Sequence, residues 1–126
     1  MKGWIMNYYN EIKNELINNE ITKKVKDYSK NKSDFTTYYN VGKLLNEAGK
    51  HYGEGIIKEY SKRLTVEFGK GYSKRNLWLM LRFYNLKGKM QTMSALLSWS
   101  HYVELLSIDN IDEINYYIMI TEQQNL

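Results

Sequence analysis

The fold is decided by residues 69–84, whose sequence is GKGYSKRNLWLMLRFY. Gly71 can adopt the positive φ of a tight turn, and Ser73 carries the short side-chain oxygen typical of a helix N-cap. Apolar side chains then recur at the i, i+3, i+4 and i+7 spacing of a helix with one buried face. They are Leu77, Met80, Leu81 and Tyr84. The stretch predicts a turn followed by an amphipathic helix.

The cations of this predicted helix lie away from its apolar stripe. Arg75, Trp78 and Arg82 share a second face. Lys74 and Asn76 fall in the first turn, where backbone N–H groups lack helical partners and favour a phosphate. Neither arginine belongs to the apolar stripe, so both are expected to be removable with little loss of stability. A solvated face would carry the same residues without any ligand.

A further helix is predicted immediately before the turn, over residues 54–68. Its apolar side chains share one side, and Lys58 and Lys62 stand on the other. Two helices joined by a short glycine turn form a helix-turn-helix-like pair, an arrangement used to read DNA. The apolar positions are Ile56, Ile57, Tyr60, Leu64 and Phe68.

The amino-terminal part of the chain predicts two more helices. The first runs to about Lys26, and a loop is expected at residues 31–33, with Ser33 or Asp34 capping a second helix that ends at 51–53. The expected apolar positions of the first helix are Ile5, Tyr9, Ile12, Leu16, Ile17, Ile21, Val25 and Tyr28. Those of the second are Phe35, Tyr38, Tyr39, Val41, Leu44, Leu45 and Ala48.

The carboxy-terminal part predicts a fifth and a sixth helix. Gly88 closes the helix of residues 74–86, and Ser98 is expected to cap a fifth helix that runs through Leu106. Asp109 or Asp112 should cap the sixth, whose apolar positions are Ile114, Tyr117, Ile118 and Ile120. Within the fifth helix we expect Trp99 and Tyr102 in the core, and His101 as a hydrogen-bonding partner near the same surface.

Helical spacing throughout predicts an all-α fold, a compact domain of five to six helices spanning residues 1–126. A chain of 126 residues with 43% hydrophobic content can bury a core as a single domain. The amino terminus has no apolar signal core, and the longest uncharged run, residues 90–103, is too short and polar to cross a bilayer. We expect a soluble, cytoplasmic protein with no membrane partner.

Charge is distributed unevenly along the chain. Residues 58–89 hold nine basic and two acidic side chains, a net charge of +7, whereas residues 90–126 hold five acidic and no basic ones. A cationic centre before an anionic segment indicates either a face for a polyanion or a contact between the two segments.

Catalytic and metal-binding patterns are not found in the sequence. There is no cysteine, and the two histidines, His51 and His101, lie far apart without neighbouring ligands. Asp109, Asp112 and Glu113 cluster without the lysine and strand of a metal-dependent nuclease and are interpreted as helix caps and first-turn acids. We predict no catalytic residue, no metal and no cofactor.

Several motifs in one order resemble a known family. They are YYNVGK at 38–43, YG at 52–53, IxxYSKRL at 57–64, FGKGYSKRNL at 68–77, MxxFY at 80–84 and LSWSHYVELL at 97–106. This pattern, from about residue 38 to the end, resembles the amino-terminal domain of the YhcG-type family of bacterial proteins, long labelled a domain of unknown function.

The resemblance implies a helical domain, thought to bind DNA, in front of a PD-(D/E)XK nuclease domain that holds the metal-binding carboxylates. That second domain is not in this sequence, and the apolar pattern of the sixth helix is unfinished at residue 126, so we expect the chain to be part of something longer.

The expected function is non-catalytic nucleic-acid binding, with duplex DNA as the partner, to target an attached or separately encoded nuclease. The residues expected to make the contacts are Lys62, Arg63, Lys70, Lys74, Arg75, Asn76 and Arg82. The alternative is a protein-interaction or oligomerisation domain. In that case the first helix pairs with another chain, and the +7 segment meets an acidic surface, such as that of a second copy.

Overall fold

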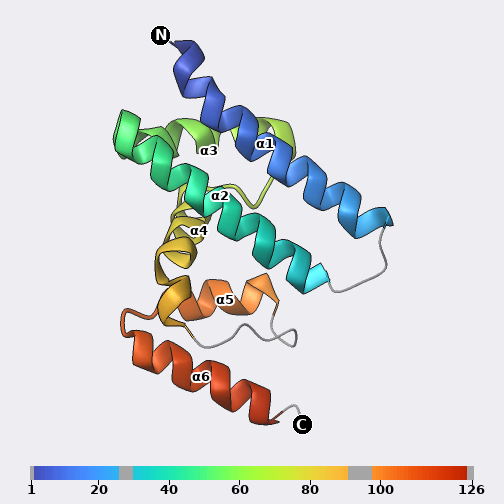
Figure 1. The fold of residues 1–126 in the computed structure, drawn as a ribbon, viewed down its shortest axis with the longest axis vertical. Coiled ribbons are helices and arrows are strands. Elements are labelled where there is room, and N and C mark those ends of the chain that lie inside the picture. The colour runs from blue at the N-terminus through green and yellow to red at the C-terminus, as the bar shows by residue number, and fades with distance from the viewer. Residues whose placement is uncertain (1, 26–29, 91–97, 125–126) are drawn as a thin grey trace.

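A computed structural model describes residues 2–25, 30–90 and 98–124, which contain six α-helices, one 3-10 turn and no strand (Figure 1). The predicted all-α fold is confirmed. The elements are α1 Lys2–Val25, α2 Lys30–Tyr52, α3 Gly55–Phe68, α4 Lys74–Leu86, η1 Lys87–Lys89, α5 Trp99–Leu106 and α6 Ile111–Gln124. None of the described helices is both long and apolar enough to cross a membrane.

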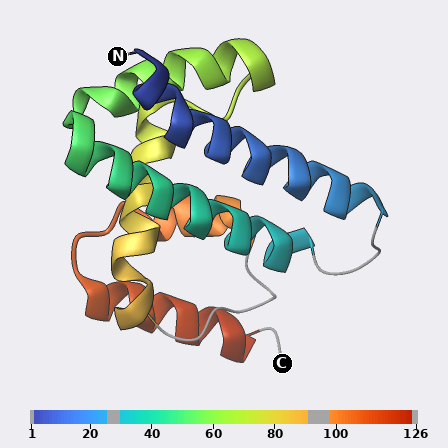
Figure 2. The same cartoon turned by 45° about the horizontal axis from the view of Figure 1, so that its top comes forward.

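Helix α4 lies at the centre of the molecule. Helices α1, α2 and α3 surround its first half, and α5 and α6 lie towards its other end (Figures 1 and 2). The core accordingly has two clusters, which meet on α4. Leu77 and Met80 belong to the cluster shared with α1, α2 and α3. Leu79 and Phe83 belong to the cluster shared with α2, α5 and α6.

The prediction of a single apolar stripe on α4 was therefore incomplete. Leu79 and Phe83 are buried, whereas Tyr84 is half-buried against the ring of Tyr39, 5.1 Å away between centroids. Leu81 is also only partly buried. A helix that passes through the middle of a domain buries two faces, and one-sided amphipathic spacing does not describe it.

Helix α2 begins earlier than predicted. Residues 31–33, expected as a loop, are helical. Asp34 does not cap the helix, because its carboxylate accepts hydrogen bonds from α1, at 3.0 Å from both Asn19 Nδ2 and Lys23 Nζ. The charge of Asp34 thus holds α2 against α1 near the amino-terminal end of α2, where an anion is favourable.

The predicted buried faces of α1 and α6 are partly wrong. Ile17 and Ile21 on α1 are 42% and 53% exposed, and Tyr117 on α6 is exposed as well, because these side chains lie on faces that no described helix covers. Of the other predicted positions, the side chains of Ile5 and Val25 and the whole of Tyr28 lie outside the described residues.

Helices α5 and α6 begin near the predicted residues, but the residue that caps α6 differs from the prediction. The backbone N–H of Ser98 donates to His101 Nδ1 at 3.1 Å, and Tyr102 is fully buried. At α6 the cap is Asn110, whose Oδ1 accepts from the N–H groups of Asp112 and Glu113 at 2.8 and 3.3 Å. The predicted caps Asp109 and Asp112 do not fill that role.

A tyrosine, a glutamate and a lysine join α1 to the end of α3. The Tyr9 hydroxyl donates to Glu67 Oε2, and Lys13 Nζ donates to Oε1 at 3.1 Å. Both hydrogen bonds favour the charged carboxylate and lower the pKa of Glu67, the bond from Tyr9 most strongly. Burial, followed by the bond to Glu67, raises the pKa of Tyr9.

We predict that Glu67→Gln makes the stability of the protein less dependent on pH in the acid range. A carboxyl group with a depressed folded-state pKa stabilises the fold above its unfolded pKa, near 4.5, and this contribution disappears as pH falls through the folded value. Urea unfolding between about pH 3 and 7 measures it. Glu104→Gln, at an exposed position of α5, is the control, and an equal flattening in both variants would contradict the prediction.

Candidate nucleic-acid interface

The turn between α3 and α4 has a fixed conformation. Gly69 and Gly71 have φ values of 87° and 107°, the left-handed region that side chains disfavour. Ser61 Oγ on α3 donates to the carbonyl of Tyr72 at 2.7 Å. The turn therefore presents Lys70 from a defined backbone.

The first turn of α4 is fixed in the same way. Ser73 Oγ accepts from the N–H of Asn76 at 3.2 Å, which confirms the predicted N-cap. The side chain of Asn76 turns back and donates to the carbonyl of Gly71 at 3.2 Å. The amide of Asn76, expected to contact nucleic acid, thus serves the turn through one of its two N–H groups.

The lysines of this region have no partner among the residues that the structure describes. Lys58, Lys62, Lys70 and Lys74 are all exposed, and none forms an ion pair or hydrogen bond with another described residue. Lys58 and Lys62 are four residues apart and therefore share one side of α3. Arg63 differs, because its Nε lies 3.1 Å from Glu59 Oε1 in an exposed pair. We call Lys58, Lys62, Lys70 and Lys74 the lysine surface.

The two predicted arginines of α4 have different surroundings. Arg82 is partly buried, and its guanidinium donates to the carbonyls of Leu106 and Ile108 at 2.7 and 2.9 Å, just where α5 ends. Arg75 is exposed and donates to Ser107 Oγ at 3.0 Å. Arg82 therefore joins α4 to α5, a structural role that its helical spacing did not predict.

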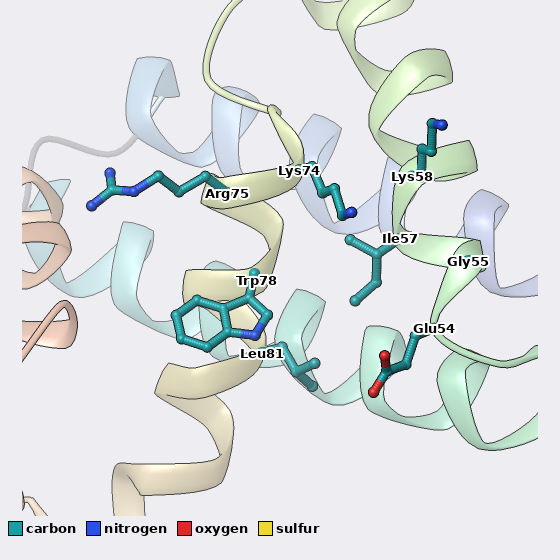
Figure 3. Close-up of a pocket in the computed structure, with 8 residues that line it drawn as sticks. All are labelled: Glu54, Gly55, Ile57, Lys58, Lys74, Arg75, Trp78 and Leu81. Carbon is teal, nitrogen blue, oxygen red and sulfur yellow. The ribbon is translucent and has the colours of Figure 1, made fainter. Parts of the chain in front are cut away.

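A pocket of about 780 Å³ opens between the start of α3 and the first half of α4 (Figure 3). Trp78, 49% exposed, forms part of its wall. In Figure 3 the side chain of Arg75 extends away from the pocket, towards α5. The residues that line it are Glu54, Gly55, Ile57, Lys58, Lys74, Arg75, Trp78 and Leu81.

Two charged residues of this region were not among the predicted contacts. Lys58 could have been included, because its spacing from Lys62 places both on one side of α3. Glu54 could not, because the sequence indicates only that a helix begins there. Its carboxylate does not cap α3 and has no partner among the described residues. Only the packing of α3 beside α4 places Glu54 in the lining of the same pocket as Trp78 and Lys74.

No group of three or more histidine, aspartate or glutamate side chains that could hold a metal ion occurs among the described residues.

The structure is an all-α domain in which a glycine turn joins two helices. Beside this turn lie a pocket and four lysines without partners among the described residues. The chain belongs to the family described as the DUF1016 N-terminal domain, whose sequence profile matches residues 7–126. The match confirms the resemblance to the YhcG-type amino-terminal domain and extends it to α1. No curated protein and no solved structure gave a significant match.

Proposed function

We propose that this chain is a nucleic-acid-binding domain, with DNA as its partner, that targets a PD-(D/E)XK nuclease, either attached or separately encoded. The observation that supports this best is the lysine surface, where four exposed cations have no partner in the described part of the chain. Exposed cations of this kind bind phosphates and release counterions. Cleavage is assigned in this proposal to the nuclease domain that the family resemblance implies, not to this chain.

The predicted contact residues have unequal roles in this proposal. Lys62, Lys70 and Lys74 contact phosphates directly, and Arg75 joins them by giving up one exposed hydrogen bond to Ser107. Arg63 can exchange its exposed partner Glu59 in the same way, since such pairs contribute little to stability.

The central position of α4 limits how this helix meets DNA. Its middle is buried on two faces, so its exposed first turn and the exposed side chain of Trp78 are the parts of α4 beside the lysine surface that can approach a ligand. Recognition helices commonly use their amino-terminal residues to reach bases. We therefore propose that the turn and the start of α4 touch the duplex, while Asn76 and Arg82 maintain the fold.

We predict that Lys62→Ala with Lys70→Ala weakens duplex binding and lowers the salt slope of log K by about 2, one per lost phosphate contact. Fluorescence anisotropy titrations with duplex DNA at several salt concentrations measure both quantities. Duplex RNA and single-stranded DNA, titrated in parallel, test the preference for DNA.

Lys24→Ala with Lys43→Ala is the matched control, since it removes the same charge from exposed positions of α1 and α2. The proposal requires this control to retain nearly the parental slope. Equal losses in both variants would mean that net charge alone governs binding, and the absence of binding to every nucleic acid would overturn the proposal.

The alternative of a protein-interaction or oligomerisation domain is favoured by a different observation. Apolar side chains stand exposed on the two outer helices, Ile17 and Ile21 on α1 and Tyr116, Tyr117 and Met119 on α6. Exposed apolar patches often mark interaction sites. If no nucleic acid binds, light scattering of the protein would show whether these faces support self-association.

A further inference from the structure

We infer that the pocket between α3 and α4 holds one unpaired nucleotide of a bound strand, with its base against Trp78 and its phosphate near Lys58 and Lys74. This inference rests on the proposed nucleic-acid binding and specifies the feature that the domain selects. The pocket volume of about 780 Å³ lies within the range of about 300–1,000 Å³ typical of small-ligand sites.

The pocket has apolar and aromatic walls that can pack against a flat aromatic ring. Trp78 lies over α4 with the nitrogen side of its indole towards Leu81, and Leu81 and Ile57 supply further apolar surface to the same pocket. An indole that is 49% exposed can accept a further flat partner. Bases stack on such side chains with little regard to sequence, because every base has a π-face.

The cations of the pocket match the charge of the same ligand. Lys58 comes from α3 and Lys74 from α4, and neither has a partner among the described residues. They belong to the lysine surface, which is proposed to follow the backbone of the strand. A nucleotide in the pocket would therefore lie on the path of its own strand.

Glu54 narrows the class of ligand. A carboxylate that has no partner among the described residues would repel a bare phosphate or an acidic peptide. It can accept N–H groups from a base, as glutamate does from the amino group of cytosine. Adenine, cytosine and guanine carry an exocyclic amino group, and thymine does not. In a duplex the faces of a base are stacked and its pairing edge is occupied, so the base must be unpaired to enter.

The test compares two labelled DNA duplexes that differ only by one unpaired cytosine in the centre of one strand. We expect the parent protein to bind the bulged duplex about 5- to 150-fold more tightly, the range for one stacked base. Trp78→Ala should remove this preference, so that the variant binds the bulged and the perfect duplex with equal affinity. Trp78→Phe should restore part of it.

Tyr116→Ala, at another exposed aromatic position, is the matched control and should retain the preference. Thermal melts followed by circular dichroism establish that each variant is folded. If Trp78→Ala is unfolded, Glu54→Gln tests the inference in its place, because this substitution preserves the size of the side chain. Glu54→Gln should reduce the preference for an unpaired cytosine over an unpaired thymine.

The outcomes separate this inference from the function on which it rests. Salt-dependent binding of both duplexes with equal affinity would overturn the inference and leave the proposed function in place. Free cytidine monophosphate that binds as tightly as the bulged duplex would also overturn it, since the pocket would then be a free-nucleotide site. Failure to bind any nucleic acid would overturn the proposed function itself.

Discussion

Gly42→Ala is expected to lower the free energy of unfolding by about 3 kcal/mol, at the upper end of the usual cost of overpacking. An added Cβ would lie 2.2 Å from the carbonyl oxygen of Met80 and 2.9 Å from Cβ of Tyr84. Neither is the end of a flexible side chain, so α2 and α4 would have to separate. Since α4 carries both core clusters, the separation would loosen each of them. Urea unfolding gives the measurement.

Gly49→Ala provides the control on the same helix. Nothing lies within 4 Å of a Cβ at this position, and replacing glycine by alanine within a helix stabilises it by roughly 0.5–1 kcal/mol. The two substitutions should therefore shift stability in opposite directions. Equal effects would show that α2 and α4 do not approach as closely as Gly42 indicates.

Local features of the fold could be predicted because local chemistry determines them. The N-cap at Ser73 and the positive φ of Gly71 depend on neighbouring residues, and both are confirmed. The burial of Leu79 and Phe83 could not be predicted, because it depends on which helices cover the second face of α4. The same reason explains why Ile17 and Ile21, apolar and correctly spaced, are exposed.

In the candidate site, too, features set by neighbouring residues could be predicted, whereas features set by helix packing could not. Helical spacing identifies Lys62, Lys70 and Lys74 as solvent-facing cations, and the structure places them so. It does not reveal that Arg82 reaches carbonyl groups 24 and 26 residues away in sequence. Nor does it place Glu54 and Trp78 in the lining of one pocket, because that requires the packing of α3 beside α4. Helical spacing predicts which charged side chains face solvent, but it does not predict which residues each of them contacts within the protein.

Arg82→Ala is expected to destabilise the protein by about 2–4 kcal/mol. Two hydrogen bonds from a charged group are lost, each worth about 1.5–3 kcal/mol, and water replaces part of this contribution because the site is only partly buried. The carbonyls of Leu106 and Ile108, now satisfied at 2.7 and 2.9 Å, would lose a partly buried donor. The melting temperature should fall by roughly 10 °C. This reverses the expectation from sequence that Arg82 could be removed with little loss of stability.

Arg75→Ala is the control that separates structure from binding, because it removes the same charge from the same helix. Arg75 is exposed and makes one hydrogen bond, to Ser107, so its loss should change stability by less than about 0.5 kcal/mol. In anisotropy titrations at a temperature where both variants are folded, Arg75→Ala should lower the salt slope by about 1 and Arg82→Ala by nearly 0. If Arg82→Ala is as stable as the parent protein and instead lowers the salt slope by about 1, the guanidinium of Arg82 contacts phosphate. The contact between α4 and α5 then does not depend on Arg82.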